Sequence, residues 1–415
     1  MKSFKLKLTL PLRAISAAMI FPLCALATPS ITVDRVQQRY PWNGCVDIDY
    51  TIADLDGDPV DYRVELTATA DGQALAITNT FPEAVCDLSA TEGAHRVTWR
   101  AGADVRVSAA SLKVSASIVY APVTAATADY LVVDLSAGTA AGATYPIRCL
   151  KGDWPSSVFN SDLYKTERLV LKRVRAGTFL MGGNKVSGAA EHYVTISKDF
   201  FLGVFETTVH QYRLVTGTLP ENQSYYDKKT GLLLPEHPDF ELYGVGGVSI
   251  RDSLLTPTGF FALLCARTRY HGMPFSGFAL PTESEWEYAC RAGTTTAFFW
   301  GDDSSRDVVN QYAHYYISDK LTPAHTYRVG ERLPNPWGFY DMTGNQWEWT
   351  ASGYGTYPEG TEENPAVDPQ GLPEGDPVKR GGSFWRQADY MKSANRTGPT
   401  NTTADYGFRI LCRPE

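Results

Sequence analysis

Apolar and polar residues alternate in short runs along the first part of the chain. The clearest runs lie at residues 45–52, 62–68, 96–99 and 112–119, with glycine and aspartate residues between them. Successive side chains of a β-strand point to opposite faces of a sheet, so this alternation is typical of strands with one buried face. Residues 28–125 are therefore predicted to form an all-β sandwich domain of the immunoglobulin or fibronectin type.

The pattern changes after this part. Residues 121–128 are small and rich in Ala and Thr, which is typical of a linker. One further apolar run, at residues 130–134, predicts a strand, and chain rich in Gly, Pro and Ser follows it. We therefore predict a connector over residues 126–165, which leads into a second domain over residues 166–415.

Helical periodicity is sparse in this second domain. Short amphipathic patterns predict three helices, over residues 209–215, 259–269 and 283–291. For the third helix, Thr282 is a suitable N-cap, Glu285 completes a capping box and Gly293 provides a C-terminal stop. The remaining chain is rich in Gly, Pro and Trp and has little regular periodicity, which indicates much irregular structure.

The N-terminus carries the features of a secretory leader. Basic residues are followed by a short apolar run that ends in Ala25-Leu26-Ala27. This combination is typical of a signal peptide, which is predicted over residues 1–27, so the protein is expected to be secreted or periplasmic. Cys24 leaves a lipoprotein signal as the alternative, although Pro22 and Leu23 are bulky where such a signal has small residues.

Charge and hydropathy exclude two classes of partner. The full chain has 38 basic and 46 acidic residues. The predicted leader contains four basic and no acidic residues, so its removal leaves 34 against 46 and a net charge of −12. Nucleic-acid binding relies on clustered Lys and Arg, so no nucleic-acid partner is expected. After the leader, no segment has the roughly 18 consecutive apolar residues of a membrane-spanning helix.

Four motifs follow one another in the last third of the chain. They are LPTESEWEYACRAG at 280–293, NPWGFYDMTGNQWEW at 335–349, RGGSFW at 380–385 and DYGFR at 405–409. In this order and spacing they resemble the formylglycine-generating enzyme, or sulfatase-modifying factor, family. The resemblance covers roughly residues 169–413. It implies an α+β domain with the C-type-lectin-like fold of that family, preceded by the predicted all-β sandwich.

The resemblance also identifies a cleft from which a metal site is missing. Family members oxidise a substrate cysteine with copper held by two cysteines, three and eight residues after the serine of the Gly-Gly-Ser motif. The corresponding positions here are Arg386 and Met391, and an arginine cannot ligate a soft ion such as Cu(I). A copper cofactor is therefore not expected. The cleft residues that the resemblance suggests as ligand-binding candidates are Trp347, Ser383, Arg386, Tyr390, Met391 and Arg396.

Three functions remain open at this point. The preferred one is a calcium-stabilised module that binds a protein, a peptide or a small polar ligand in the cleft, where Arg386 would suit an anionic group. The alternative is an oxidative tailoring enzyme of the wider family, acting on a protein or a small molecule. The third, formylglycine generation itself, is disfavoured by the absent cysteines. No catalytic residue is assigned.

The resemblance further implies a calcium site in the second motif. In the family, calcium is bound at the positions matching Asp341 and Glu348 and by the backbone carbonyls matching Gly344 and Gln346. Calcium prefers carboxylate and carbonyl oxygens, so the residues present are suitable. The alternative is that Glu348 pairs with a buried arginine. A second calcium loop of the family would correspond to Asn310 and Gln311, but its downstream partner region does not align.

Six cysteines remain after the leader, and an even number in an exported chain favours disulfides. Cys45 and Cys86 share the N-terminal domain and are a plausible pair. The resemblance suggests a second pair, between Cys290 and Cys412. Burial as free thiols is the alternative.

Overall fold

A computed structural model describes most of the chain. The described residues are 30–39, 44–53, 62–75, 77, 80–81, 92–101, 112–120, 123–152, 160–220, 237–270, 272–317, 326–372, 375–398 and 405–414. The predicted signal peptide and Cys86, the predicted partner of Cys45, lie outside these ranges. In this described part, every helix is too short or too polar to cross a membrane.

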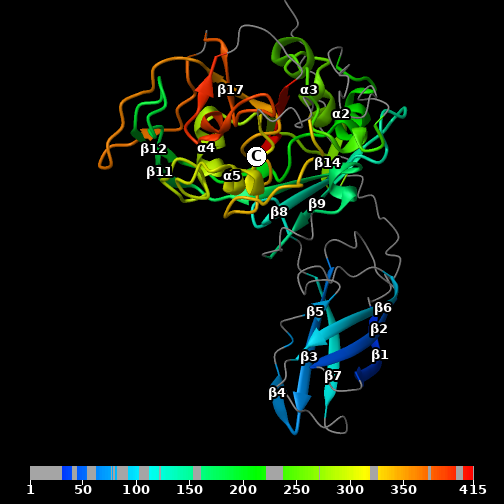
Figure 1. Ribbon diagram of the computed structural model, residues 1–415. Coiled ribbons are helices and arrows are strands. Elements are labelled where there is room, and N and C mark those ends of the chain that lie inside the picture. Colours follow the sequence, from blue (N-terminus) through cyan, green and yellow to red (C-terminus); the bar gives the residue numbers. More distant parts are fainter. Residues whose placement is uncertain are drawn as a thin grey trace, which may run out of the picture.

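The N-terminal strands form two sheets, which Figure 1 shows as a separate group. One sheet has the order β1-β2-β6-β5 and the other the order β4-β3-β7. The strands are β1 (Ser30–Gln38), β2 (Cys45–Ala53), β3 (Tyr62–Ala70), β4 (Gln73–Leu75), β5 (Thr80–Phe81), β6 (Gly93–Arg100) and β7 (Lys113–Tyr120). The two sheets share one hydrophobic core, to which β2, β3 and β6 contribute buried residues.

Four of these strands coincide with the alternating runs of the sequence. In β2, Val46, Ile48, Tyr50 and Ile52 are buried while the residues between them are partly exposed. The sequence did not predict β1, β4 or β5, and the residues of β1 are only half-buried at best, so its pattern is weaker. Two sheets around a shared core agree with an all-β unit, and its assignment to the immunoglobulin or fibronectin type stays a prediction.

An eight-stranded sheet forms the centre of the C-terminal domain. Its order is β15-β14-β9-β8-β10-β13-β22-β16. The strands are β8 (Tyr130–Asp134), β9 (Tyr145–Leu150), β10 (Arg168–Val174), β13 (Phe200–Gly203), β14 (Thr268–Tyr270), β15 (Met273–Pro274), β16 (Phe278–Ala279) and β22 (Leu411–Cys412). The last strand of the chain, β22, therefore lies beside β13 from the early part of the domain.

The predicted connector over residues 126–165 contributes to this sheet and is not a separate segment. β8 pairs with β9 on one side and with β10 on the other. Residues 130–133 are all buried, because β8 is an inner strand covered on both faces. The folded domain thus begins upstream of residue 166, and of the two strands in the connector the sequence predicted only β8.

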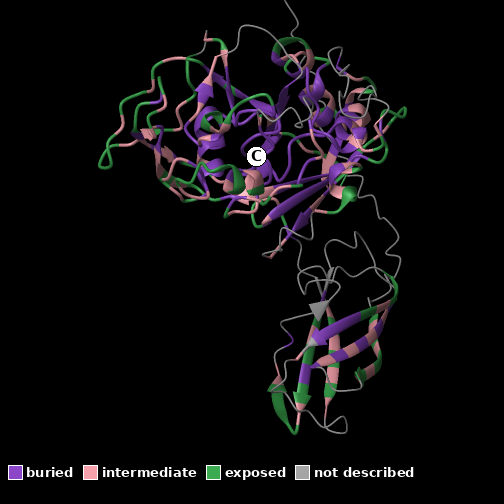
Figure 2. Ribbon diagram, in the orientation of Figure 1, coloured by how far each residue is buried: buried purple, intermediate pink, exposed green. Residues whose placement is uncertain are grey.

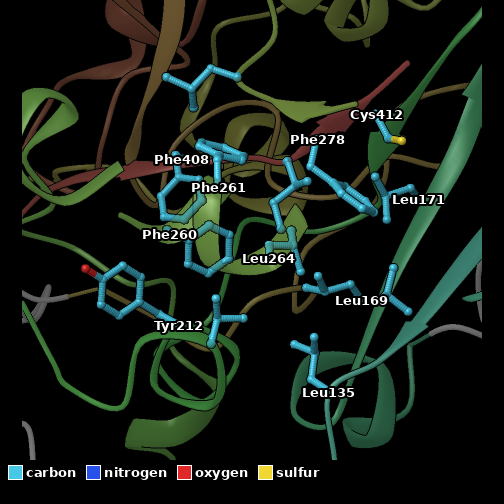
Figure 3. Packing of buried hydrophobic residues seen from close by; sticks show 14 of the residues in the cluster. Leu135, Leu169, Leu171, Tyr212, Phe260, Phe261, Leu264, Phe278, Phe408 and Cys412 are labelled. Carbon is cyan, nitrogen blue, oxygen red and sulfur yellow. The ribbon is translucent and has the colours of Figure 1, made fainter. Parts of the chain in front are cut away.

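The two faces of the central sheet carry different cores. Helices α2 (Val209–Thr216) and α3 (Phe260–Arg267) build one of them, where Tyr212 stacks on Phe260 with ring centroids 5.6 Å apart and Phe260 packs against Phe408 at 5.0 Å (Figure 3). The core on the other face contains Trp286 and Leu411. Figure 2 shows that buried residues fill the interior of this domain.

The helix α4 (Glu283–Arg291) begins as the sequence predicts. The Thr282 hydroxyl accepts a hydrogen bond from the Glu285 N–H, and the Glu285 carboxylate accepts one from the Thr282 N–H, which forms the capping box. At the other end, Ala292 takes the left-handed conformation at φ 48°, one residue before Gly293. The sequence also predicted α2 and α3 and missed α5 (Arg306–Tyr312).

Two smaller sheets and several short helices complete the domain. One sheet has the order β11-β12-β18, from β11 (Gly177–Met181), β12 (His192–Ile196) and β18 (Ala366–Val367). The other has the order β20-β19-β17-β21, from β17 (Trp347–Gly353), β19 (Pro377–Arg380), β20 (Arg396–Thr397) and β21 (Tyr406–Phe408). The short helices are the 3-10 turns η3 (Asp162–Lys165), η5 (Phe240–Leu242) and η7 (Ala388–Met391), and the π-helix η6 (Ile250–Leu254). The second sheet brings three of the four sequence motifs together.

The predicted disulfide between Cys290 and Cys412 is wrong. Both residues are free thiols, and they lie in the cores on opposite faces of the central sheet. Alternate residues of a strand point to opposite faces, so in β22 it is Leu411, and not Cys412, that faces the side of Cys290. Burial raises the pKa of the Cys290 thiol to about 12.

Candidate functional site

Buried ion pairs connect α4 to the sheet of order β20-β19-β17-β21, which carries three of the sequence motifs. Glu283 accepts hydrogen bonds from Arg396, from Nε at 2.7 Å and from Nη2 at 2.8 Å. Glu287 accepts from Arg291 Nε at 2.8 Å and also from Arg380. All five side chains are buried. Burial opposes ionisation of Glu287, but the two arginines outweigh it and lower the pKa of this carboxyl.

A second buried pair joins β17 to the residue that follows β21. Arg409 Nη2 lies 2.7 Å from Glu348 Oε1, and Trp286 Nε1 of α4 donates to Glu348 Oε2 at 2.7 Å. Removing one partner of such a pair leaves an uncompensated buried charge, which is strongly destabilising. These side chains therefore fix the motifs relative to one another. We call the whole set the ionic frame: Glu283, Glu287, Arg291, Glu348, Arg380, Arg396 and Arg409.

The residues that the resemblance assigned to a cleft lie beside this frame. The buried Ser383 hydroxyl donates to Asp405 Oδ2 at 2.7 Å, and the carbonyl of Asp405 accepts from the Trp347 N–H at 2.9 Å. Trp347 is only 1% exposed, and its indole Nε1 has no hydrogen-bond partner within the described residues. Its ring meets Tyr390 edge to face, with centroids 6.3 Å apart. The structure thus brings Trp347, Ser383 and Tyr390 together.

Arg386 lies on the exposed rim of this cleft. Its side chain is exposed, its guanidinium carbon is 5.6 Å from the centroid of the Tyr390 ring, and it forms no ion pair with any described residue. Its backbone carbonyl accepts a hydrogen bond from the Tyr316 N–H at 2.8 Å. Three aromatic side chains around it are 38–44% exposed. We call this group the cleft patch: Tyr316, Trp385, Arg386 and Tyr390.

Two predicted cleft residues are not available in the cleft. Met391 is fully buried and packs in a core with Phe298 and Val309, so its thioether is committed to packing. Arg396 is 6% exposed, and the ionic frame holds its guanidinium against Glu283. The two positions that match the copper cysteines therefore carry an exposed cation and a core side chain.

Lys379 in β19 is a cleft component that the sequence did not single out. Its ammonium lies 3.2 Å from the centroid of the Tyr406 ring and 5.6 Å from that of Trp347. Burial is the main cause that lowers the pKa of Lys379; Asp405 opposes it, the Arg386 guanidinium adds to it, and the result is a pKa of about 7. An amine with this pKa is close to half-protonated at neutral pH.

The predicted calcium ligands are satisfied by protein groups. Both carboxylate oxygens of Glu348 lie within 3.2 Å of Arg409 Nε, and Asp341 Oδ2 accepts from the Gly330 N–H at 2.6 Å. In the described part of the chain, no three His, Cys, Asp or Glu residues form a metal-binding group. In this arrangement Arg409 pairs with Glu348, as the alternative interpretation expected, and calcium binding stays a prediction.

A third carboxylate, which the sequence did not reveal, lies close to the predicted ligands. Glu206 is fully buried and accepts hydrogen bonds from the Gln346 N–H at 3.0 Å and from the Asn345 amide. Burial raises the pKa of Glu206, and the carboxylates of Asp341 and Glu348 raise it further. The side chains that favour the ionised form of Asp341 are His314, Arg409 and Lys165.

The second predicted calcium position lies in α5. Asn310 and Gln311 are in the last turns of this helix, and the carbonyl of Gln311 accepts a hydrogen bond from the Leu333 N–H at 2.9 Å. That carbonyl is therefore committed to a backbone contact.

The chain is similar to a known protein family and to several curated proteins. Residues 160–414, more than half of the chain, match the "Sulfatase-modifying factor enzyme 1-like domain" family. The "Formylglycine-generating enzyme" of Bos taurus is 33% identical over 150 residues, which are 32% of this chain and 39% of that protein. The enzyme of the same name from Mycobacterium tuberculosis is 33% identical over 147 residues, 34% of this chain and 42% of that protein. The chain thus spans less than half the length of these curated relatives.

Two solved structures are also similar to the chain. "Treponema denticola variable protein 1" has a TM-score of 0.48 and 24% identity, covering 60% of this chain and 96% of that one. PvdO from Pseudomonas aeruginosa has a TM-score of 0.46 and 22% identity, covering 59% of this chain and 94% of that one. On the match over residues 160–414, the chain belongs to the sulfatase-modifying factor family and contains a formylglycine-generating-enzyme-like domain.

Proposed function

We propose that the C-terminal domain is a binding module which has lost copper-dependent cysteine oxidation. The observation that carries the proposal is the state of the two positions matching the copper cysteines, where Arg386 is exposed and Met391 is buried in a core. A Cu(I) site needs soft thiolate ligands. Between residues 381 and 411 the sequence contains no cysteine.

The chemistry of the cleft supports a ligand with an anionic group. Arg386 is exposed and has no carboxylate partner in the described part of the chain, whereas Lys379 and Trp347 behind it are buried. Guanidinium groups bind carboxylates and phosphates through paired hydrogen bonds. The exposed rings of the cleft patch would contact the apolar part of such a ligand.

A further relative is consistent with a loss of catalysis in the family. The protein named "Inactive C-alpha-formylglycine-generating enzyme 2" from Bos taurus is 37% identical over 83 residues, 19% of this chain and 28% of that protein. Its name describes that protein alone. It supports the proposal by showing that the family includes a member described as inactive.

Benzoate and its uncharged analogue benzamide would test this cleft. We expect benzoate to bind more tightly to the purified protein, as measured by calorimetry. Arg386→Ala should weaken benzoate binding about 10- to 100-fold, because a charge-assisted hydrogen bond contributes about 1.5–3 kcal/mol. The variant should melt at the wild-type temperature, because Arg386 is exposed.

The matched control is Arg251→Ala, which removes an exposed arginine outside the cleft patch. This variant should bind benzoate as the wild type does. Equal affinity of benzoate and benzamide, or equal loss in the two arginine variants, would contradict an anion site at Arg386.

Calcium and export are separate proposals. Calcium is supported by the buried carboxylates of Glu206 and Asp341, which could hold it with backbone carbonyls while Arg409 keeps Glu348. A ligand that binds only the folded state stabilises it by about 2.7 kcal/mol at a hundredfold excess over its Kd, so EDTA should lower the melting temperature. An unchanged melting temperature after EDTA treatment would refute calcium binding.

Export is supported by the predicted leader. An intact mass that matches a mature chain starting near Thr28 would establish it.

A further inference from the structure

A cavity lies at the start of β12, a strand that Figure 1 labels. One wall is formed by the segment from Val186 that leads into β12, and the other by residues 354–361 after β17. The volume is about 820 Å³, which is within the range of small-molecule sites. None of the residues suggested for the cleft lines this cavity.

The walls are tied together from behind by Arg396. Its Nη1 donates to the Gly188 carbonyl of one wall at 3.0 Å and to the Gly355 carbonyl of the other at 2.7 Å. Its charge is compensated by Glu283, as described above. At a second point, the Tyr193 N–H donates to the Gly360 carbonyl at 3.0 Å. The cavity is therefore held open by fixed contacts, and a ligand would meet preorganised walls.

The lining of the cavity carries negative charge that nothing in the described chain compensates. Glu191 and Glu359 come from opposite walls, and both are exposed. Neither carboxylate has a hydrogen bond or an ion pair with a described residue. No lysine or arginine lines the cavity. These features favour a cation over an anion or a neutral ligand.

A buried imidazole provides an independent indication of a ligand. His192 lines the same cavity and is 5% exposed. Its Nδ1 lies 3.0 Å from the Ala190 carbonyl and so donates to it, which leaves Nε2 as the acceptor nitrogen. Nε2 is buried and has no hydrogen-bond partner within the described residues. A buried acceptor without a donor is unfavourable, and an N–H group of a ligand that reached it from the cavity, after a shift of the ring, would relieve it.

We propose that this cavity binds an organic cation which carries N–H donors on a short apolar stem. Such groups occur in arginine or lysine side chains of peptides and in free polyamines. Glu191 and Glu359 would pair with the charge, His192 Nε2 would accept a hydrogen bond, and Val186 and Tyr354 would contact the stem. This site is independent of the function proposed for the cleft.

Calorimetry with two isosteric probes tests the proposal on the full chain. Argininamide and citrullinamide have nearly the same shape and the same α-amino group, but the side chain of argininamide ends in a cationic guanidinium and that of citrullinamide in a neutral urea. We expect saturable binding of argininamide and binding of citrullinamide that is weaker by about tenfold or more. Glu191→Gln and Glu359→Gln should each weaken argininamide binding about threefold to fivefold, and the double variant should weaken it further.

Two controls separate this site from the rest of the surface. Asp389→Asn removes an exposed carboxylate elsewhere, and Arg386→Ala removes the cation of the cleft patch; both should bind argininamide as the wild type does. Spermidine and the peptide Gly-Arg-Gly distinguish the two sources of the organic cation. Tighter binding of spermidine identifies a polyamine, and tighter binding of Gly-Arg-Gly identifies a peptide. Equal binding of the two amides, absence of saturable binding, or a double variant with wild-type affinity would each overturn the proposal.

Discussion

The ionic frame and the cleft patch both contain arginines from residues 380–396, and these arginines differ in almost every physical respect. In the frame, Arg380 and Arg396 are buried and each is held by carboxylates of α4. In the cleft patch, Arg386 lies only a few residues away on the chain, is exposed and has no ion pair among the described residues. The buried arginines of the ionic frame are needed for folding, whereas Arg386 of the cleft patch is free to contact a ligand.

This difference would allow a sequence to keep the motifs of an enzyme family after losing its chemistry, as we propose for this chain. The motif residues that carry the resemblance, among them Trp286, Glu348 and Arg409, contact one another in the frame and in the core. The positions that would hold copper are outside the frame. Replacing them does not disturb the ion pairs, so the fold can persist after the reaction is lost.

The largest expected effect comes from breaking the frame. Glu287→Gln removes the carboxylate shared by Arg291 and Arg380 and leaves both guanidinium groups without their main partner. Breaking a buried pair typically costs about 3–5 kcal/mol, so we expect a decrease of this size in the free energy of unfolding. Chemical denaturation monitored by tryptophan fluorescence measures it.

The matched variant in the other region is Asp389→Asn. Asp389 lies in η7, and its exposed side chain forms an ion pair with Lys392 at 3.2 Å. An exposed pair contributes little, so this variant should unfold as the wild type does. Similar losses in the two variants would show that the comparison between the regions is mistaken.

A smaller effect is expected from Lys379, and it depends on pH. Burial lowers the pKa of Lys379 to about 7 in the folded protein, while an unfolded chain keeps a value near 10.4. Between these values the unfolded state binds a proton that the folded state does not, so this group makes stability rise with pH. The rise is at most about 1.4 kcal/mol per pH unit, and it is lost as the pH falls toward 7.

Replacing the lysine should remove this rise. We expect the unfolding free energy of Lys379→Met minus that of the wild type to decrease steadily from pH 7.5 to pH 9, because only the wild type gains stability. Lys198→Met, at an exposed position, is the control and should show no such trend. A constant difference for Lys379→Met would mean that the buried amine keeps its ordinary pKa.

The features that could be predicted from the sequence are those with a local signal. Thr282 and Glu285 are three residues apart and form the capping box of α4 as expected. The alternation in β2 also marks its buried face correctly. In both cases, the interacting or alternating residues are neighbours in the chain, so spacing alone is sufficient.

The features that were missed depend on contacts between distant segments. Arg396 follows the Gly-Gly-Ser motif closely, but in β20 its side chain contacts Glu283 and ties together the walls of the cavity at β12. Cys412 is one position away from the face of β22 that would approach Cys290. Glu206 and His192 acquire their importance only through burial, and no pattern around them in the sequence indicates it.

The central claim is that the domain has lost copper-dependent cysteine oxidation. Its most direct test incubates the purified protein with Cu(I), oxygen and a cysteine-containing sulfatase peptide, and then determines the peptide mass. An active formylglycine-generating enzyme in a parallel reaction shows that the assay works. We predict that the peptide remains unchanged with this protein. Conversion of its cysteine to the aldehyde would contradict the account.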